Sequence, residues 1–436
     1  MKLLGPLNKS FEDLPITTQF RWIFGLALVC ELISLVFYFN YFDRHRYLPA
    51  PFFLDKNDTF MDFYHPLFWA LRDEFYTTFH SVYPPLNFLI LKLIGWCIHF
   101  GGSKSAATAF ELRQNSVSLT LIVCGIYLAI IAFVVNLGQW GRLALGDRAL
   151  VFGVCALSAP VLFGLERGNM IFFGLPLMAL YLDSKSSAKK ALYLAALINI
   201  KPYFLVLLIR YMNLRSINKK MITQVTIFTA VIFFVLSSFA GLDCVKFFQS
   251  YFLFLSKYTI TAEGAVGFAH NLAALARIKE LIYFGQHQHY SFWFSVLKVM
   301  SSLSILILVY QIILKPLSQL ELIIGSVVIL TNFSVSTGGY ILMIYILLIP
   351  YLFYSPEYRF LLVPILGIFT FPLDWINLFS IPATHFYSYL GNTTLLTSAQ
   401  DYQIAAGSVV RPLLNFSVLS LFSVHLVGKY HFLRSK

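Results

Sequence analysis

Long apolar runs alternate with short polar segments along almost the whole chain. Five runs reach the length of about 20 residues that a helix needs to cross a membrane: 20–40, 116–137, 222–241, 291–313 and 406–428. Five shorter runs lie between them: 148–164, 169–182, 320–334, 340–354 and 361–378. The pattern predicts an all-α, polytopic transmembrane bundle of about ten spans, organised as a single domain over residues 1–436.

Composition supports lipid as the solvent of this chain. Of the 436 residues, 58% are hydrophobic and 12% are charged, whereas soluble domains carry about 25% charged residues. Mean hydropathy is +0.73. These values exclude a cytosolic enzyme, a disordered protein and a disulfide-stapled secreted domain. The five cysteines are singly spaced and form no CxxC pair, so we interpret them as small hydrophobic residues.

The net charge of +12 indicates membrane orientation rather than nucleic-acid binding, because the basic residues gather in alternate short loops. Lys and Arg accumulate on the cytoplasmic side of short loops. With the N-terminus inside, the predicted inner segments carry 17 of the 32 basic residues. Both termini then lie inside, and three large segments lie outside: 41–115 with juxtamembrane helices, 242–290 and 379–405.

The alternation of inner basic loops and outer segments requires that two apolar stretches do not cross the membrane as single helices. Residues 86–100 are short, carry Lys92 and follow Pro84-Pro85, which favours a partly embedded outer helix. Residues 191–212 have basic loops at both ends and Lys201-Pro202 in the middle. Because proline breaks a helix, we predict two half-helices, 191–200 and 203–212, forming a re-entrant hairpin.

The first outer segment contains a candidate catalytic acid. Asp62 lies between Met61 and Phe63, which places a carboxylate against an apolar surface, where it is suited to act as a general base. A solvated loop acid or a helix N-cap accounts for the same residue. Tyr64 lies two positions after Asp62, and Tyr83 begins a Tyr83-Pro84-Pro85 element in the same outer segment.

The next outer turn reads Glu166-Arg167-Gly168-Asn169. It places an acid, a base and an amide beside a flexible glycine at the membrane face. These residues are candidates for substrate binding, and a salt-bridged turn that caps two helices is the alternative interpretation.

Lys201 lies at the tip of the predicted hairpin, and an ionisable residue within the membrane is a functional hypothesis by default. A lysine in this position suits a phosphate at the lipid interface. Snorkelling or pairing with a buried acid such as Glu31 is the alternative.

The large outer segment supplies His270 and Asn271, which are candidates for binding a sugar hydroxyl or a phosphate, although a lone histidine is commonly structural. His287-x-His289 has a spacing seen in metal sites but lacks an evident third ligand. We therefore predict no metal and no cofactor.

The ensemble resembles the GT-C class of integral-membrane glycosyltransferases and is most similar to glycosyltransferase family 87, the polyprenol-phosphate-mannose-dependent enzymes. The matching elements occur in the family order over about residues 20 to 350: the early acid Asp62, Tyr83-Pro84-Pro85, Glu166-Arg167-Gly168-Asn169 and Lys201-Pro202. His270-Asn271 falls where the family has an asparagine-centred motif. The sequence departs from the family at Ser336 to Tyr340, where relatives tend to have a Ser-Pro element.

The resemblance implies a hexosyltransferase whose donor is a sugar on a polyprenyl phosphate and whose acceptor is a glycan hydroxyl. Asp62 would be the base of a single inverting displacement, and Lys201 and Arg167 would stabilise the leaving phosphate. The aromatic rings of Tyr64 and Tyr83 would stack on sugar faces. For a bacterial protein this implies the inner membrane, with a periplasmic active site and a surface polysaccharide as acceptor. The alternatives are an O-antigen polymerase or ligase, disfavoured because 242–290 holds Arg277 as its one arginine, and a flippase or other transporter, disfavoured because no internal repeat is evident.

Overall fold

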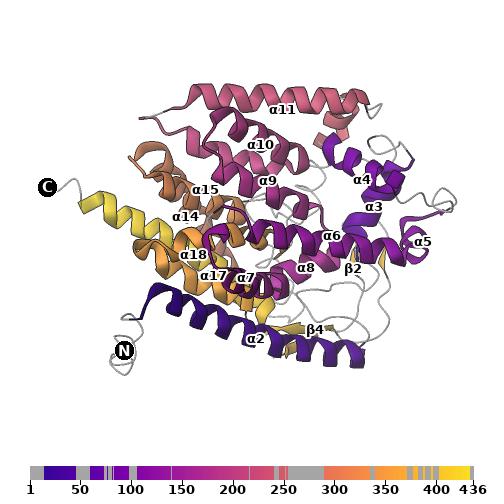
Figure 1. Cartoon of the computed structure of the whole chain (residues 1–436), viewed down its shortest axis with the longest axis horizontal. Coiled ribbons are helices and arrows are strands. Elements are labelled where there is room, and N and C mark those ends of the chain that lie inside the picture. The colour runs from indigo at the N-terminus through magenta and orange to yellow at the C-terminus, as the bar shows by residue number, and fades with distance from the viewer. Residues whose placement is uncertain are drawn as a thin grey trace.

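A computed structural model gives the fold of the chain, and one large hydrophobic cluster runs through its helices. The structure describes residues 14–45, 59–72, 76, 81, 83–97, 106–138, 140–215, 217–239, 245–250, 252–253, 289–333, 339–370, 377–381, 386–387, 394–395 and 402–432. Over these residues the chain is predominantly a helical bundle, as the apolar pattern predicts (Figure 1).

The first part of the bundle contains α2 (Ile16–His45), α3 (Met61–Ala70), α4 (Pro85–Cys97), α5 (Ala109–Gln114), α6 (Val117–Val135), η3 (Trp140–Arg142), α7 (Leu145–Leu157), α8 (Ala159–Arg167) and α9 (Ile171–Asp183). The second part contains α10 (Ser187–Ile200), η4 (Pro202–Tyr211), α11 (Lys219–Phe239), α14 (His289–Leu314), α15 (Gln319–Phe333), η6 (Gly339–Leu347), α16 (Ile349–Phe353), η7 (Pro356–Leu361), α17 (Leu362–Thr370) and α18 (Ala406–Phe432). The η elements are 3-10 helices.

Four of the described helices are long and apolar enough to cross a membrane. They comprise Ile16–Asn40, Val117–Val135, Lys219–Ser238 and Val410–Tyr430. A fifth candidate is the pair α7 and α8, which is bent by 56° at a break around Ser158. Shorter apolar helical stretches are Pro85–Trp96, Ile171–Asp183, Pro202–Tyr211, Val299–Leu314 and Gln319–Asn332. Some are short because the apolar run is interrupted, for example between Ile200 and Pro202.

The helix ends gather at two opposite sides of the bundle. At one side, which we call the basic end, lie the C-terminus of α9, the N-termini of α10 and α11 and the C-terminus of η4, together with the basic residues 185–190 and 210–220. The start of α2 and the end of α18 point the same way (Figure 1). The opposite end carries α3, α4, α5 and the start of α6 (Figure 1).

The chain from α10 to η4 makes a hairpin whose turn is at Lys201. Lys201 has the extended backbone expected of a residue before proline (φ −142°, ψ 115°), and the helix breaks at the residue that the sequence predicts. Tyr211, at the end of η4, accepts or donates a 3.0 Å hydrogen bond with the hydroxyl of Tyr181 at the end of α9. The hairpin therefore returns to the basic end, although its second arm is a 3-10 helix.

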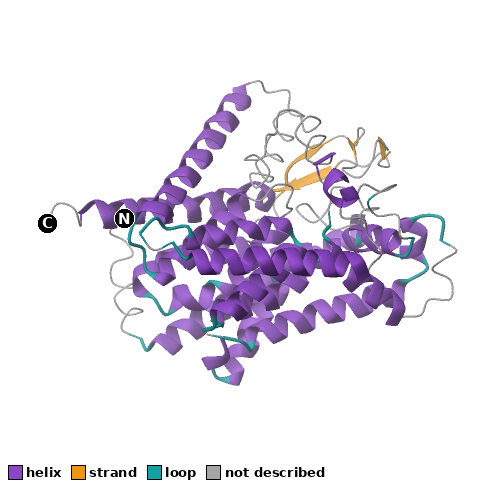
Figure 2. Ribbon diagram, turned by 90° about the horizontal axis from the view of Figure 1, so that it is seen from above, coloured by secondary structure: helices purple, strands orange, loops and turns teal. Residues whose placement is uncertain are grey.

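The segment expected to be an outer loop, 379–405, contributes to two short strand pairs rather than to irregular structure alone. β1 (Asn377–Ile381) pairs antiparallel with β4 (Tyr402–Ala405), with a bulge between Asn377 and Phe379. β2 (Phe386–Tyr387) pairs with β3 (Thr394–Leu395). These strands lie together at one side of the helical bundle (Figure 2).

The hairpin generates a topology prediction. Reporter domains fused after residues 187 and 217 should read the same side of the membrane, because η4 returns to the end at which α10 begins. From the basic residues beside both positions we expect that side to be the cytoplasm. A fusion after residue 114, at the opposite end, is the control and should read the other side. Opposite readouts at 187 and 217 would require a single crossing between them.

Candidate functional site

The turn between α8 and α9 is built by helix-capping chemistry. Helix α8 ends at Arg167, and Gly168 has a left-handed backbone with φ of 63°. The amides of Gly168 and Asn169 donate to the carbonyl groups of Leu165 and Gly164, each at 3.0 Å, which is a Schellman arrangement. The side-chain oxygen of Asn169 then accepts from the amide of Ile171 at 3.0 Å and begins α9.

The N-terminus of α3 packs directly on this turn. The amide of Phe60 donates to the carbonyl of Glu166 at 2.7 Å. Phe60 has φ of 61° and is the one non-glycine with positive φ among the described residues, so its backbone is strained. A Cβ on Gly168 would lie 2.9 Å from both Phe60 Cδ1 and Phe63 Cβ. The close approach brings Asp62, in the first turn of α3, against the Arg167–Asn169 segment.

Both carboxylate oxygens of Asp62 are held by this turn. Arg167 Nη2 donates to Oδ1 at 2.7 Å, and Asn169 Nδ2 donates to Oδ2 at 2.7 Å. The side chains of Asp62 and Arg167 are 15% and 17% exposed, which leaves the ion pair mostly buried but reachable from outside the core. Charge-assisted hydrogen bonds of this length are strong and fix the orientation of the carboxylate.

The tip of the α10–η4 hairpin supplies a third polar group. The ammonium of Lys201 lies over the ring of Tyr83, 4.3 Å from its centroid, as a cation–π contact. Asn87, fully buried in α4, donates from Nδ2 to the carbonyl of Ile200. This bond ties the Tyr83-Pro84-Pro85 element to the residue before Lys201.

The electrostatics keep Asp62 ionised. Burial alone would raise the pKa of its carboxyl group, but the charge of Arg167, the hydrogen bonds from Arg167 and Asn169 and the charge of Lys201 together hold that pKa below its usual value. Nearby His65 has its pKa lowered to about 4 by burial. At neutral pH the site therefore presents one carboxylate, two cations and an uncharged imidazole.

Of the residues that the sequence proposes, five lie together: Asp62, Tyr83, Arg167, Asn169 and Lys201. The backbone carbonyl of Glu166 accepts a hydrogen bond from the amide of Phe60, two residues before Asp62. His270 and Asn271 lie outside the residues that the structure describes.

Two expectations from the sequence take a different form in the structure. Tyr64 is fully buried, and its hydroxyl lies 2.8 Å from both the carbonyl of Ser116 and the hydroxyl of Thr120, so it joins α3 to α6 rather than facing a ligand. Glu31, considered above as a partner for Lys201, lies in α2 near Cys155 and makes no ion pair with that lysine.

The structure adds residues that sequence reasoning does not select. Tyr127, from α6, donates to the carbonyl of Gly168 at 3.1 Å and stacks on Phe172. Tyr203 and Tyr340 lie within electrostatic range of Tyr83. All three occur in apolar runs, where a tyrosine that lines a site has the same local pattern as one in the core. Asn87 follows Tyr83 by four residues, and that spacing is the one signal that could have indicated it.

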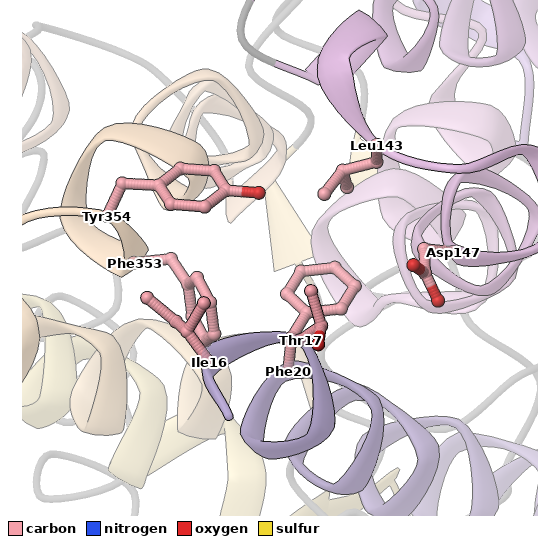
Figure 3. A pocket seen from close by; sticks show the side chains of 7 residues that line it. All are labelled: Ile16, Thr17, Phe20, Leu143, Asp147, Phe353 and Tyr354. Carbon is pink, nitrogen blue, oxygen red and sulfur yellow. The ribbon is translucent and has the colours of Figure 1, made fainter. Parts of the chain in front are cut away.

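A small hollow at the basic end has no role in this chemistry. It is lined by Ile16, Thr17, Phe20, Leu143, Asp147, Phe353 and Tyr354 (Figure 3). Its carboxylate, on Asp147, binds Arg21 Nε at 2.7 Å. Within the described part of the chain, no group of three His, Cys, Asp or Glu side chains is placed to hold a metal ion.

Comparison of the chain with protein-family models, with curated proteins and with solved structures finds no match in any of the three. The interpretation of the site therefore rests on its own geometry and chemistry.

The packing of α3 on the turn predicts that Gly168→Ala is destabilising. The left-handed backbone costs a residue with a Cβ about 1–2 kcal/mol, and the contacts with Phe60 and Phe63 add to this cost. The melting temperature in detergent should fall. Gly146→Ala in α7 is the control, since its Cβ would meet nothing within 4 Å, and it should leave the melting temperature unchanged or slightly raised. Equal effects of the two changes would contradict the packing argument.

Proposed function

We propose that the chain is a membrane-embedded glycosyltransferase that moves a hexose from a polyprenyl-phosphate donor to a hydroxyl of a glycan acceptor. The observation that carries the proposal is the ionised carboxylate of Asp62, clamped by Arg167 and Asn169, with the ammonium of Lys201 close by. A base for a hydroxyl proton and cations for a phosphate are the groups that this transfer needs.

The proposed placement in the membrane puts the basic end in the cytoplasm and the site towards the outer, periplasmic face. We propose about ten crossings and one re-entrant hairpin, with the shorter apolar helices completing the spans. Helices α9 and α10 have 13 and 14 residues and rise about 20 Å from the basic end at 1.5 Å per residue. The apolar core of a bilayer is about 30 Å thick, so Asn169 and Lys201 would lie roughly 10 Å below the outer surface.

This depth suits a donor with a lipid tail. A polyprenyl chain stays among the helices and lipids, while its phosphate and sugar need a polar recess that begins below the headgroups. We propose that the chain breaks at Gly168 and Lys201 line such a recess, since non-helical backbone at this depth is tolerated where it is buried in protein or lines a cavity. The acceptor would enter from the outer aqueous side.

The transfer is proposed as a single displacement. The acceptor oxygen attacks the anomeric carbon as Asp62 takes its proton, and the bond from that carbon to the donor phosphate breaks. The electron pair leaves with the phosphate oxygen, whose developing charge Lys201 and Arg167 stabilise. Attack opposite to the leaving group inverts the anomeric centre. Aromatic rings such as Tyr83 provide a face for the sugar.

In this mechanism two anions compete for the guanidinium of Arg167: the Asp62 carboxylate and the donor phosphate. In the structure this guanidinium binds Asp62 at 2.7 Å, which lowers the pKa of the carboxyl group and weakens it as a base. A donor phosphate beside Arg167 would compete for the guanidinium and return basicity to Asp62. The base would thus be strongest when the donor is bound. The resemblance to glycosyltransferase family 87 in the order of these residues supports the same assignment.

The first prediction from this mechanism is that Asp62→Asn abolishes transfer. General-base catalysis is worth roughly 10²–10⁴ in rate, and asparagine cannot accept the proton. The assay presents purified protein in nanodiscs with a panel of polyprenyl-phosphate hexoses and a glycan acceptor, and mass spectrometry measures release of polyprenyl phosphate. Donor turnover also separates a transferase from a flippase, which moves lipid without cleaving it.

Two controls separate catalysis from folding. Asp62→Asn leaves Arg167 without its carboxylate, a loss that is strongly destabilising for a buried pair. The melting temperature of Asp62→Asn in detergent therefore shows whether the loss of activity is a loss of folding, and the double variant Asp62→Asn/Arg167→Gln shows whether removing the unpaired cation restores the fold. Asp147→Asn removes the carboxylate bound to Arg21 at the basic end and should remain active. A residual rate above about a tenth of wild type in Asp62→Asn would contradict the base assignment.

The second prediction is that Lys201→Ala impairs use of the donor. Removing one preorganised cation from a developing oxyanion costs about 10²–10³ in rate, and this loss should appear in kcat/KM for the donor while the KM for the acceptor changes little. Lys201→Arg keeps the charge and should retain more activity. Lys189→Ala, at the basic end, is the matched control and should behave as wild type. An unchanged kcat/KM in Lys201→Ala would make the lysine structural.

A further inference from the structure

Arg210 is a buried cation at the basic end, far along η4 from Lys201, and no described residue is its counter-ion. Its exposed fraction is 5%. Nη1 donates to the hydroxyl of Tyr181 and Nη2 to Oε1 of Gln319, both at 3.3 Å. Its guanidinium also lies 5.4 Å and 5.2 Å from the ring centroids of Tyr181 and Tyr211.

These contacts leave most of the guanidinium unmatched. Arginine has five N–H donors, and the described residues accept two of them through long bonds to uncharged groups. No described carboxylate lies within ion-pair distance of Arg210. A buried charge without a partner is costly, so an anion that binds here would remove a large part of that cost.

Most charged side chains on the helix ends around Arg210 are basic, although Asp183 at the end of α9 is an acid. Lys190, half-buried at the start of α10, has its pKa lowered first by burial and then by the charge of Arg210. The amide of Asn218 donates to the carbonyl of Tyr211 at 3.1 Å, and Ser187 donates to Gln224 of α11 at 3.1 Å. These bonds bring the end of η4 beside the starts of α10 and α11. The exposed basic side chains on these ends are Lys185, Lys189, Arg215, Lys219 and Lys220.

Apolar side chains are exposed in the same loop. Met212 and Leu214 are 49% and 60% exposed, and Ile217 is 42% exposed. Apolar side chains interleaved with lysine and arginine beside a membrane helix are typical of a loop that lies among anionic headgroups.

We propose that Arg210 and Lys190 form a binding site for a phosphate group at the basic end, with the exposed lysines and arginines as its rim. The ligand class is a phosphate-bearing anion, either the headgroup of an anionic phospholipid in the cytoplasmic leaflet or a soluble phosphate. The site is separate from Asp62 and does not depend on the proposed transferase activity. Bound phosphate would supply the missing counter-charge and hold the hairpin arms α10 and η4 together.

The test compares thermal stability of the full-length protein in detergent with added phosphatidylglycerol, phosphatidylcholine or millimolar inorganic phosphate. A ligand that binds the native state raises the melting temperature, here by about 3 °C or more at saturation. A rise with phosphatidylglycerol alone identifies the lipid, and a rise with inorganic phosphate identifies a soluble ligand. No rise with either would overturn the proposal.

Variants assign the response to the site. Arg210→Met replaces the cation with an apolar chain of similar length and should remove the rise, whereas Arg215→Gln, which neutralises an exposed charge on the same loop, should keep most of it. Arg210→Lys and Lys190→Gln should fold and respond at several-fold higher ligand concentration, which decides the question if Arg210→Met fails to fold. A full response in Arg210→Met, or unchanged affinity in both Arg210→Lys and Lys190→Gln, refutes the assignment.

Discussion

The need to hydrogen-bond the buried backbone groups where a helix breaks inside an apolar bundle is the constraint on which this structure depends. A continuous helix satisfies its own N–H and C=O groups, so a chain break at membrane depth requires substitutes from side chains or from neighbouring backbone. At Gly168 the substitutes are the carbonyl groups of Leu165 and Gly164, the hydroxyl of Tyr127 and the amide of Phe60 on the carbonyl of Glu166. At Lys201 the substitute is the side-chain amide of Asn87 on the carbonyl of Ile200.

The groups that replace the missing helix hydrogen bonds also bring polar side chains together at these two breaks. Capping the turn at Gly168 orients Arg167 and Asn169 towards one point, and the strained backbone at Phe60 brings Asp62 to it. Breaking the helix before Pro202 leaves Lys201 extended over Tyr83. The carboxylate and the ammonium come from α3 and from the hairpin tip, more than a hundred residues apart in sequence. Their proximity is a product of the breaks and of the packing between them.

How far the sequence predicts this arrangement depends on the kind of signal each element carries. The break at Lys201-Pro202 is readable because proline removes a helix donor wherever it stands, and the return of η4 follows from basic loops at both ends. The grouping of Asp62 with Arg167 and Asn169 is suggested by the order of the motifs. The role of Tyr64 is not readable, because a tyrosine bonded to Ser116 in the core has the same local sequence as one that faces a sugar.

Other features escape the sequence for physical reasons. The strand pairing of β1 with β4 joins residues 21 to 28 positions apart, and long-range pairing is weakly encoded in local pattern. The sequence also does not determine the number of full membrane crossings. Helices such as α9, with 13 residues, are too short to cross a membrane alone, so their role depends on the helices packed against them. Local hydropathy predicts that a segment avoids water, but it does not distinguish a segment surrounded by lipid from one buried among other helices.

The short element η4 links the two polar regions of the molecule. It carries Lys201 immediately before its first residue and Arg210 near its last. At about 2.0 Å per residue a 3-10 helix of ten residues spans roughly 20 Å, so these cations lie at opposite ends of one element packed on α10 and α15. The same element therefore carries a cation of the proposed transferase site before its first residue and the cation of the proposed phosphate site near its last.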